Sequence, residues 1–196
     1  MRYPNGVKRN NQVTSHSLSN RHSYSNRGMS LEKDIQTTNR YYLEINKAVI
    51  HKKPTPIQIV KVDYPKRSAA KITEGYFQSK STTDFNGIYR SKHIDFEAKE
   101  TKNKTLFPLA NIHEHQIIHM ESILNHGGIC FFIIRFSIYN ETYFVPGDIV
   151  LKYWYQKEST GKKSIAYNVI KNKGHLIPFK YQARVDYLSV IDRLYF

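Results

Sequence analysis

Residues 94–99 read Ile-Asp-Phe-Glu-Ala-Lys, with apolar and polar side chains alternating along the stretch. A period of two is typical of a β-strand, because successive side chains point to opposite faces of a sheet. The apolar residues would then face a core, while Asp95, Glu97 and Lys99 would share the other face. The pattern therefore predicts a strand over 94–101 whose polar face carries two carboxyl groups and an ammonium group.

A second strand is predicted just upstream, over 84–89, with the polar residues 90–93 as the connector of a hairpin. The Asn-Gly pair inside the upstream strand is a competing turn signal, and a turn there would move the strand boundaries. If the connector forms the turn, the hairpin can place Asp84 beside Glu97 and Lys99.

The rest of the chain shows both helical and strand patterns. Helices are predicted over 30–45, from Pro108 to Gly127-Gly128, over 148–154 and over 186–196, and strands over 48–50, 57–62, 129–136 and 142–145, with a polar loop over 157–163. The run 129–136 is apolar throughout, which predicts a central strand buried on both faces. This order of elements indicates a mixed α/β or α+β domain built around one sheet.

The charge balance points to a polyanionic partner. The 196 residues include 30 Lys plus Arg and 16 Asp plus Glu, a formal net charge of +14. Nucleic acid is the first candidate, and a membrane surface or an acidic protein partner are the alternatives. The basic segment 64–71 contains few large apolar residues, so we expect it to project from the core.

Several classes of protein are excluded by the same sequence. The longest apolar run covers 129–134, whereas a membrane-spanning helix needs about 20 residues. No secretory signal is visible over 1–27, a stretch rich in Asn, Ser, Arg and His that predicts a mobile basic arm. Cys130 is the only cysteine, so an intrachain disulfide is excluded and a cytoplasmic location is expected. No glycine-rich phosphate loop occurs, which argues against a nucleotide-driven motor.

Two carboxyl groups beside a lysine are the combination that metal-dependent hydrolysis of a phosphodiester requires. Asp84 and Glu97 offer hard oxygen ligands for Mg²⁺, which keeps part of its water shell when bound to protein. A bound metal acidifies water and shields phosphate, and Lys99 is placed to orient that water and stabilise developing negative charge. The alternative is a solvated strand face whose charges form an ion pair.

Gln116 interrupts the inward-facing stripe of the predicted helix, four residues from both Ile112 and Met120. A buried amide needs hydrogen-bond partners. The partner is either a loop carbonyl, in a purely structural role, or the metal site, reached directly or through water.

The histidines at 113, 115 and 119 resemble a zinc helix only in the spacing of His115 and His119. Their order is not His-Glu-x-x-His and no cysteine lies nearby, so we interpret them as surface or groove residues rather than zinc ligands. Cys130 lies inside an apolar strand and is predicted to pack in the core.

Five blocks of this sequence resemble the RecU family of bacterial Holliday junction resolvases. They are Asn-Arg-Gly-Met (26–29), Val-Ile-His-Lys-Lys-Pro-Thr-Pro (49–56), Val-Asp-Tyr-Pro-Lys-Arg-Ser-Ala-Ala (62–70), Ser-Thr-Thr-Asp-Phe-Asn-Gly-Ile-Tyr (81–89) and Ile-Asp-Phe-Glu-Ala-Lys-Glu-Thr-Lys (94–102). The resemblance is looser over 7–25 and 157–180. It implies a restriction-endonuclease-like α/β core, with a central mixed sheet flanked by helices and a protruding basic stalk. The expected organisation is an arm over 1–27 and a nuclease domain over 28–196, with the stalk inserted at about 63–80.

The resemblance also implies a site and an activity. The activity is Mg²⁺-dependent, symmetric nicking of four-way DNA junctions during recombination and repair, with Mn²⁺ as a possible substitute for Mg²⁺. The implied metal ligands are Thr82, Asp84, Glu97 and Gln116, with Lys99 as transition-state stabiliser and Lys66, Arg67 and Lys71 as DNA contacts. Glu32 matches an acidic position that can join the site in related nucleases, or is simply a charge at a helix N-terminus.

The implied partners are four-way DNA junctions and a second copy of the chain, because two symmetric cuts need two sites related by a two-fold axis. A RecA-type recombinase, a branch-migration helicase and a nucleoid-associated location are further expectations, and no membrane is expected. The alternative function is a non-catalytic binder of branched DNA that remodels junctions or modulates a strand-exchange recombinase. A restriction-like enzyme that cuts ordinary duplex is a third possibility, and the projecting basic segment argues against it.

Overall fold

The protein is described by a computed structural model over residues 30–77 and 82–196, so the arm predicted at 1–27 lies outside the described residues. The main sheet has the order β1-β4-β5-β7-β8-β10. Its strands are β1 (Val49–Lys52), β4 (Phe85–Tyr89), β5 (Lys92–Thr101), β7 (Ile129–Phe136), β8 (Glu141–Pro146) and β10 (His175–Leu176). Among the strands of this sheet within residues 30–77 and 82–196, only β5 and β7 pair in parallel, and the other pairs are antiparallel. The predicted mixed α/β sheet is confirmed.

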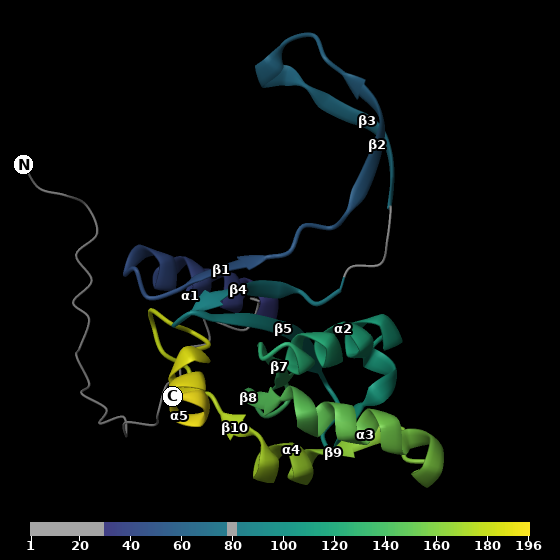
Figure 1. The fold of residues 1–196 in the computed structure, drawn as a ribbon, viewed down its shortest axis with the longest axis vertical. Helices are drawn as coiled ribbons and strands as arrows, with labels where there is room; N and C mark the ends of the chain where they lie inside the picture. The colour runs from purple at the N-terminus through teal and green to yellow at the C-terminus, as the bar shows by residue number, and fades with distance from the viewer. Residues whose placement is uncertain (1–29, 78–81) are drawn as a thin grey trace, which may run out of the picture.

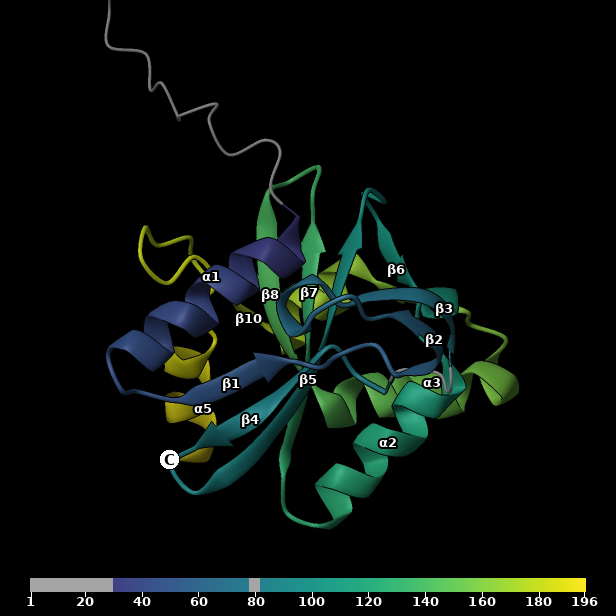
Figure 2. The same ribbon diagram turned by 90° about the horizontal axis from the view of Figure 1, so that it is seen from above.

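Helices cover both faces of this sheet (Figures 1 and 2). One hydrophobic core joins the sheet to α1 (Leu31–Glu44) and α5 (Leu188–Tyr195). The other core joins it to α2 (Glu114–Asn125), α3 (Gly147–Thr160) and α4 (Tyr167–Lys173). The predicted apolar strand, β7, lies between them, with Phe131 in the first core and Phe132 in the second, so it is buried on both faces as expected.

The predicted hairpin of β4 and β5 is confirmed, and the competing Asn-Gly turn does not form. The turn is at Arg90 and Ser91, which both have positive φ angles, while Gly87 lies inside β4. A Cβ atom on Gly87 would lie 2.1 Å from the carbonyl oxygen of Val49 on β1. The glycine therefore serves the close approach of two strands and not a turn.

The parallel pairing of β5 and β7 decides where α2 lies. Two parallel strands need a crossover, and the crossover here passes through β6 (Leu106–Pro108), η3 (Leu109–Asn111) and α2. The helix therefore runs back over β5 before β7 begins. Its first turn lies above the middle of β5, where the alternating carboxylates lie.

Residues 57–77, which follow β1, project from the body as a separate two-stranded sheet (Figure 1). It is formed by β2 (Ile57–Asp63) and β3 (Lys71–Phe77), and every residue of both strands is exposed. The projection expected over 64–71 is confirmed, but it begins earlier, at Ile57. The apolar residues of β2 had indicated a strand of the main sheet, whereas they pair only with β3.

Some predicted boundaries were wrong. The helix expected from Pro108 begins at Glu114, because Pro108 ends β6, which pairs with β9 (Ser164–Ala166). The helix expected over 148–154 continues to Thr160, into the predicted polar loop, and ends before Gly161, which takes the left-handed conformation. The short elements β9, α4 and β10 were not predicted. Within the described residues no helix is long and apolar enough to cross a membrane.

Candidate functional site

Asp84 and Glu97 meet at the start of the β4–β5 hairpin. The register pairs Phe85 with Phe96, which places Asp84, just before β4, next to Glu97 on β5. The backbone N–H of Asp84 donates to Glu97 Oε2 at 3.1 Å, and the N–H of Ala98 donates to Asp84 Oδ2 at 3.0 Å. The hairpin thus brings the two predicted carboxylates together and fixes one oxygen of each.

Lys99 is part of the same cluster. Its Nζ lies 2.6 Å from Glu97 Oε1, and the two side chains are 20% and 2% exposed. Both residues point to the polar face of β5, as the alternation predicted. The ammonium group is therefore held at the carboxylates and remains partly open to solvent.

Burial makes these carboxylates hard to ionise. Burial and, next, the negative charge of Asp84 together raise the pKa of Glu97 to about 7, against the opposing effects of Lys99 and a hydrogen bond from Gln116. Burial also raises the pKa of Asp84, against the opposing effects of the Ala98 N–H and Lys99. The carboxyl group of Glu97 is buried and that of Asp84 is partly buried, and the two interact electrostatically, so they titrate as a pair. A cation placed between them would relieve this cost.

Gln116 lies over this pair from the first turn of α2. Its Nε2 donates to the carbonyl oxygen of Thr82 at 3.1 Å, and its Oε1 accepts from the N–H of His113 at 3.0 Å. The loop-carbonyl bond expected of a structural glutamine is present, and the side chain also bonds to Glu97. Gln116 therefore links the helix, the loop before β4 and β5.

Thr82 and Glu32 lie at the edges of the site. The hydroxyl of Thr82 accepts a hydrogen bond from Lys53 Nζ at 3.0 Å. Glu32, in the first turn of α1, forms an ion pair with Lys52. The negative charge of Glu32 contributes to the raised pKa of Asp84, and the positive charge of Lys52 opposes it.

A polar cluster that the sequence did not predict lies beside the carboxylate pair. It is centred on Asp95, which is 1% exposed and bonds to Lys53, Thr83 and His119. The alternation along β5 placed Asp95 on the same face as Glu97. Nothing in the Lys52-Lys53 pair of the sequence distinguishes the lysine that turns inward. His119 was interpreted as a surface or groove residue, and it is in fact part of this cluster.

The predicted DNA contacts lie elsewhere. They lie at the far end of the projecting hairpin, at the turn between β2 and β3 (Figure 1). Arg67 begins η2 (Arg67–Ala69), Lys66 precedes it and Lys71 begins β3. All three are exposed. The structure therefore separates a projecting basic tip from the carboxylate pair.

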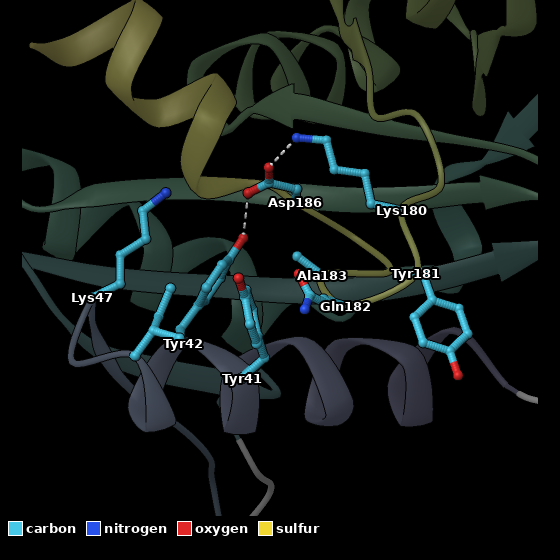
Figure 3. A pocket seen from close by; sticks show the side chains of 9 residues that line it. Tyr41, Tyr42, Lys47, Lys180, Tyr181, Gln182, Ala183 and Asp186 are labelled. Carbon is cyan, nitrogen blue, oxygen red and sulfur yellow. Dashed lines mark hydrogen bonds and ion pairs between the residues drawn. The ribbon is translucent and has the colours of Figure 1, made fainter.

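The described residues contain no group of three or more His, Cys, Asp or Glu side chains that could hold a metal. A metal at Asp84 and Glu97 would thus need other oxygen ligands, such as the Thr82 carbonyl, an amide or water. Cys130 is fully buried in β7, as predicted. A cavity of about 350 Å³ between α1 and the 180–186 segment has no lining residue in common with this site (Figure 3).

A mixed sheet flanked by helices, with two carboxylates and a lysine on one β-hairpin, defines a protein of the restriction-endonuclease-like class. The comparisons with known proteins identify the family of the chain. The RecU family model, described as Recombination protein U, matches residues 26–193, and the chain belongs to that family.

The relatives match along the full chain. Over 198 residues the chain is 60% identical to a protein of Oceanobacillus iheyensis named Holliday junction resolvase RecU, with 100% of both chains covered. Proteins with the same name from Geobacillus kaustophilus and Bacillus cytotoxicus are 56% and 53% identical, and the match covers 100% of this chain and 98% of each relative.

Proposed function

We propose that this chain resolves four-way DNA junctions by Mg²⁺-dependent, paired and symmetric nicking. The observation that carries the proposal is the contact of Asp84 with Glu97 beside Lys99. The full-length similarity to proteins named Holliday junction resolvase RecU supports the choice of substrate.

The chemistry of these side chains fits a divalent cation. Asp84 and Glu97 are neighbouring residues with hard oxygen ligands, linked by the bond from the Asp84 N–H to Glu97 Oε2, and burial raises the pKa of both. A divalent cation would lower the cost of keeping both ionised. We propose that Asp84 and Glu97 hold Mg²⁺, with Thr82 and Gln116 completing or positioning the ligand set. When bound, Mg²⁺ would acidify a water molecule and shield the phosphate charge.

Lys99 has two roles in this proposal. Its ammonium group favours the ionised form of Glu97 and limits the rise in its pKa, because a positive charge 2.6 Å away opposes protonation. The same group, partly open to solvent, can donate to a phosphate oxygen as negative charge develops there. Gln116 contributes by holding Thr82 and Glu97 in fixed relative positions.

The projecting hairpin is the proposed junction-binding element. It carries Lys66, Arg67 and Lys71 at its tip, and the formal charge of +14 favours binding to DNA phosphates. A homodimer is the proposed assembly, because a two-fold axis places two identical sites for two symmetric cuts.

The proposal is tested with a synthetic mobile four-way junction and a matched duplex, each with Mg²⁺ or EDTA. The parent protein should nick only the junction, in symmetric pairs, and only with Mg²⁺. Asp84→Asn should bind the junction as tightly as the parent does and leave it uncut. Tight binding by the parent without nicks would support the non-catalytic branched-DNA binder instead, and cutting by Asp84→Asn at the parental rate would refute the metal assignment.

A further inference from the structure

The segment 82–84 needs support from outside the sheet. It carries Thr82 and Asp84, yet strand β4 begins only at Phe85. One of its supports is the N–H of Lys53, which donates to the carbonyl oxygen of Asp84 at 2.8 Å. The side chain of Lys53 also contacts this segment, at Thr82 and Thr83.

The ammonium group of Lys53 is fully used inside the protein. It donates to Thr82 Oγ1 at 3.0 Å, to Thr83 Oγ1 at 2.7 Å and to Asp95 Oδ2 at 2.7 Å. The side chain is 14% exposed, whereas that of Lys52 is 46% exposed. An ammonium group has three N–H donors. Lys53 is therefore not arranged as a surface contact for phosphate.

The Asp95 carboxylate offsets the energetic cost of burying the charged ammonium group of Lys53. This carboxylate neutralises Lys53, accepts a hydrogen bond from Thr83 and lies 3.1 Å from His119 Nε2. A buried ion pair is stable only when its remaining polar groups also find partners. The cluster meets this condition, and it connects β1, the 82–84 segment, β5 and α2.

The Asp95 cluster lies beside the Asp84–Glu97 pair, displaced from it along both β5 and α2. Asp95 precedes Glu97 by two residues, about 6.6 Å along β5. His119 follows Gln116 by three residues, about 4.5 Å along α2. Gln116 therefore bonds to Glu97 while His119 contacts Asp95. Residues 82–84 are thus held by two sets of contacts. Gln116 and Glu97 form one set, and Lys53 and Asp95 form the other.

We propose that Lys53 is a positioning residue for the candidate metal site: neutralised by Asp95, it holds Thr82 and Thr83 and so sets the position of Asp84. This inference rests on the proposed function. It assigns Lys53 no contact with DNA and none with the metal.

The test compares two double variants, each of which removes a Lys–Asp pair without leaving an unpaired charge. One is Lys53→Met with Asp95→Asn. The matched control is Lys180→Met with Asp186→Asn, a pair at 2.5 Å beside the separate cavity (Figure 3). Mn²⁺ binding to the protein alone is measured by titration calorimetry, and junction binding is measured in EDTA.

The Lys53/Asp95 variant should bind Mn²⁺ roughly tenfold to a hundredfold more weakly than the parent, as is typical when the supports of metal ligands are removed. Junction cleavage should need correspondingly more Mg²⁺ and approach the parental rate at saturation, because Asp84, Glu97 and Lys99 remain. Junction binding in EDTA should not change. The control variant should match the parent in all three measurements.

Parental Mn²⁺ affinity in the Lys53/Asp95 variant would overturn the inference and leave the proposed function intact. Loss of junction binding in EDTA, or of the folded circular dichroism spectrum, would also overturn it, because Lys53 would then serve DNA binding or the fold. A parent protein that binds Mn²⁺ but cuts no junction would instead refute the proposed function.

Discussion

The raised pKa of Glu97 predicts a specific loss of stability as the pH rises in the absence of metal. The side chain is 2% exposed, and burial together with the adjacent Asp84 moves its pKa from 4.5 to about 7. Below about pH 4.5, both the native and the unfolded state hold the proton. Between about pH 4.5 and 7 only the native state holds it, so the free energy of unfolding falls as the pH rises. Above about pH 7 neither state holds the proton, and the fall is complete.

The size of this loss follows from the shift. A change of about 2.5 pKa units at about 1.4 kcal/mol per unit corresponds to about 3 kcal/mol. For a chain of this size, that is a change in melting temperature of roughly 6–12 °C. Glu97→Gln cannot ionise and should lack this component.

The assay is thermal unfolding of the parent and of Glu97→Gln in EDTA at pH 5 and pH 8. Titrating groups outside the Asp84–Glu97 pair are common to both proteins, so the difference between the two pH-dependent changes reports the ionisation of that pair. The parent should lose more stability between pH 5 and pH 8 than the variant does. Glu158→Gln, which removes an exposed glutamate of α3, is the control and should follow the parent.

The effect of Mg²⁺ on thermal stability is a second measurement of the role of Glu97. At pH 8 Mg²⁺ should stabilise the parent and leave Glu97→Gln almost unaffected, because the variant lacks one of the two proposed carboxylate ligands. Equal pH dependence in the two proteins, within about 2 °C, would refute the reasoning. Glu97 would then be no harder to ionise in the folded protein than in the unfolded chain.

Three further perturbations test other parts of the structure. Lys99→Met should slow junction cleavage by roughly a hundredfold at saturating Mg²⁺ while leaving junction affinity in EDTA unchanged, and a parental rate would exclude the proposed role in the transition state. Replacing Lys66, Arg67 and Lys71 together with alanine should make the negative slope of log affinity against log salt less steep by about 3. An unchanged slope would show that these three residues do not contact DNA phosphates. Gly87→Ala should destabilise the protein by roughly 3 kcal/mol in urea unfolding, because its Cβ would lie 2.1 Å from the Val49 carbonyl oxygen, and parental stability would show that β1 can move away without cost.

Local patterns along the chain determined the centre of this fold. The alternation over 94–99 predicted which face of β5 carries Glu97 and Lys99, and the apolar run over 129–136 predicted a strand buried on both faces. These signals are reliable because the side chains of a strand alternate strictly and each sheet face has one environment. The hairpin of β4 and β5 followed from the same strands and brought Asp84 to Glu97.

Long-range contacts decided the features that local sequence patterns did not determine, such as the role of Gln116 and the sheet to which β2 belongs. Gln116 had two interpretations from the sequence, and the crossover that carries α2 over β5 gave it bonds to both Thr82 and Glu97. The apolar residues of β2 look like part of the main sheet, yet β2 pairs with β3 in the projecting hairpin. The short elements β9, α4 and β10 carry too few residues for a periodic signal. They depend on tertiary contacts: β9 and α4 pack into the core through Ile165 and Ile170, and β10 pairs with β8.

Lys52 and Lys53 show most directly the difference between what the sequence determines and what the tertiary structure decides. They are chemically identical neighbours in the sequence, and no composition or periodicity separates them. The tertiary structure turns Lys53 toward Asp95, which arrives from a strand 42 residues further along the chain, and leaves Lys52 in a partly exposed pair with Glu32. The strand pattern determined that Asp95 shares a face with Glu97, but only the folded chain decided which lysine would neutralise it. Burying a carboxylate is favourable only when a specific partner is brought to it from elsewhere in the fold.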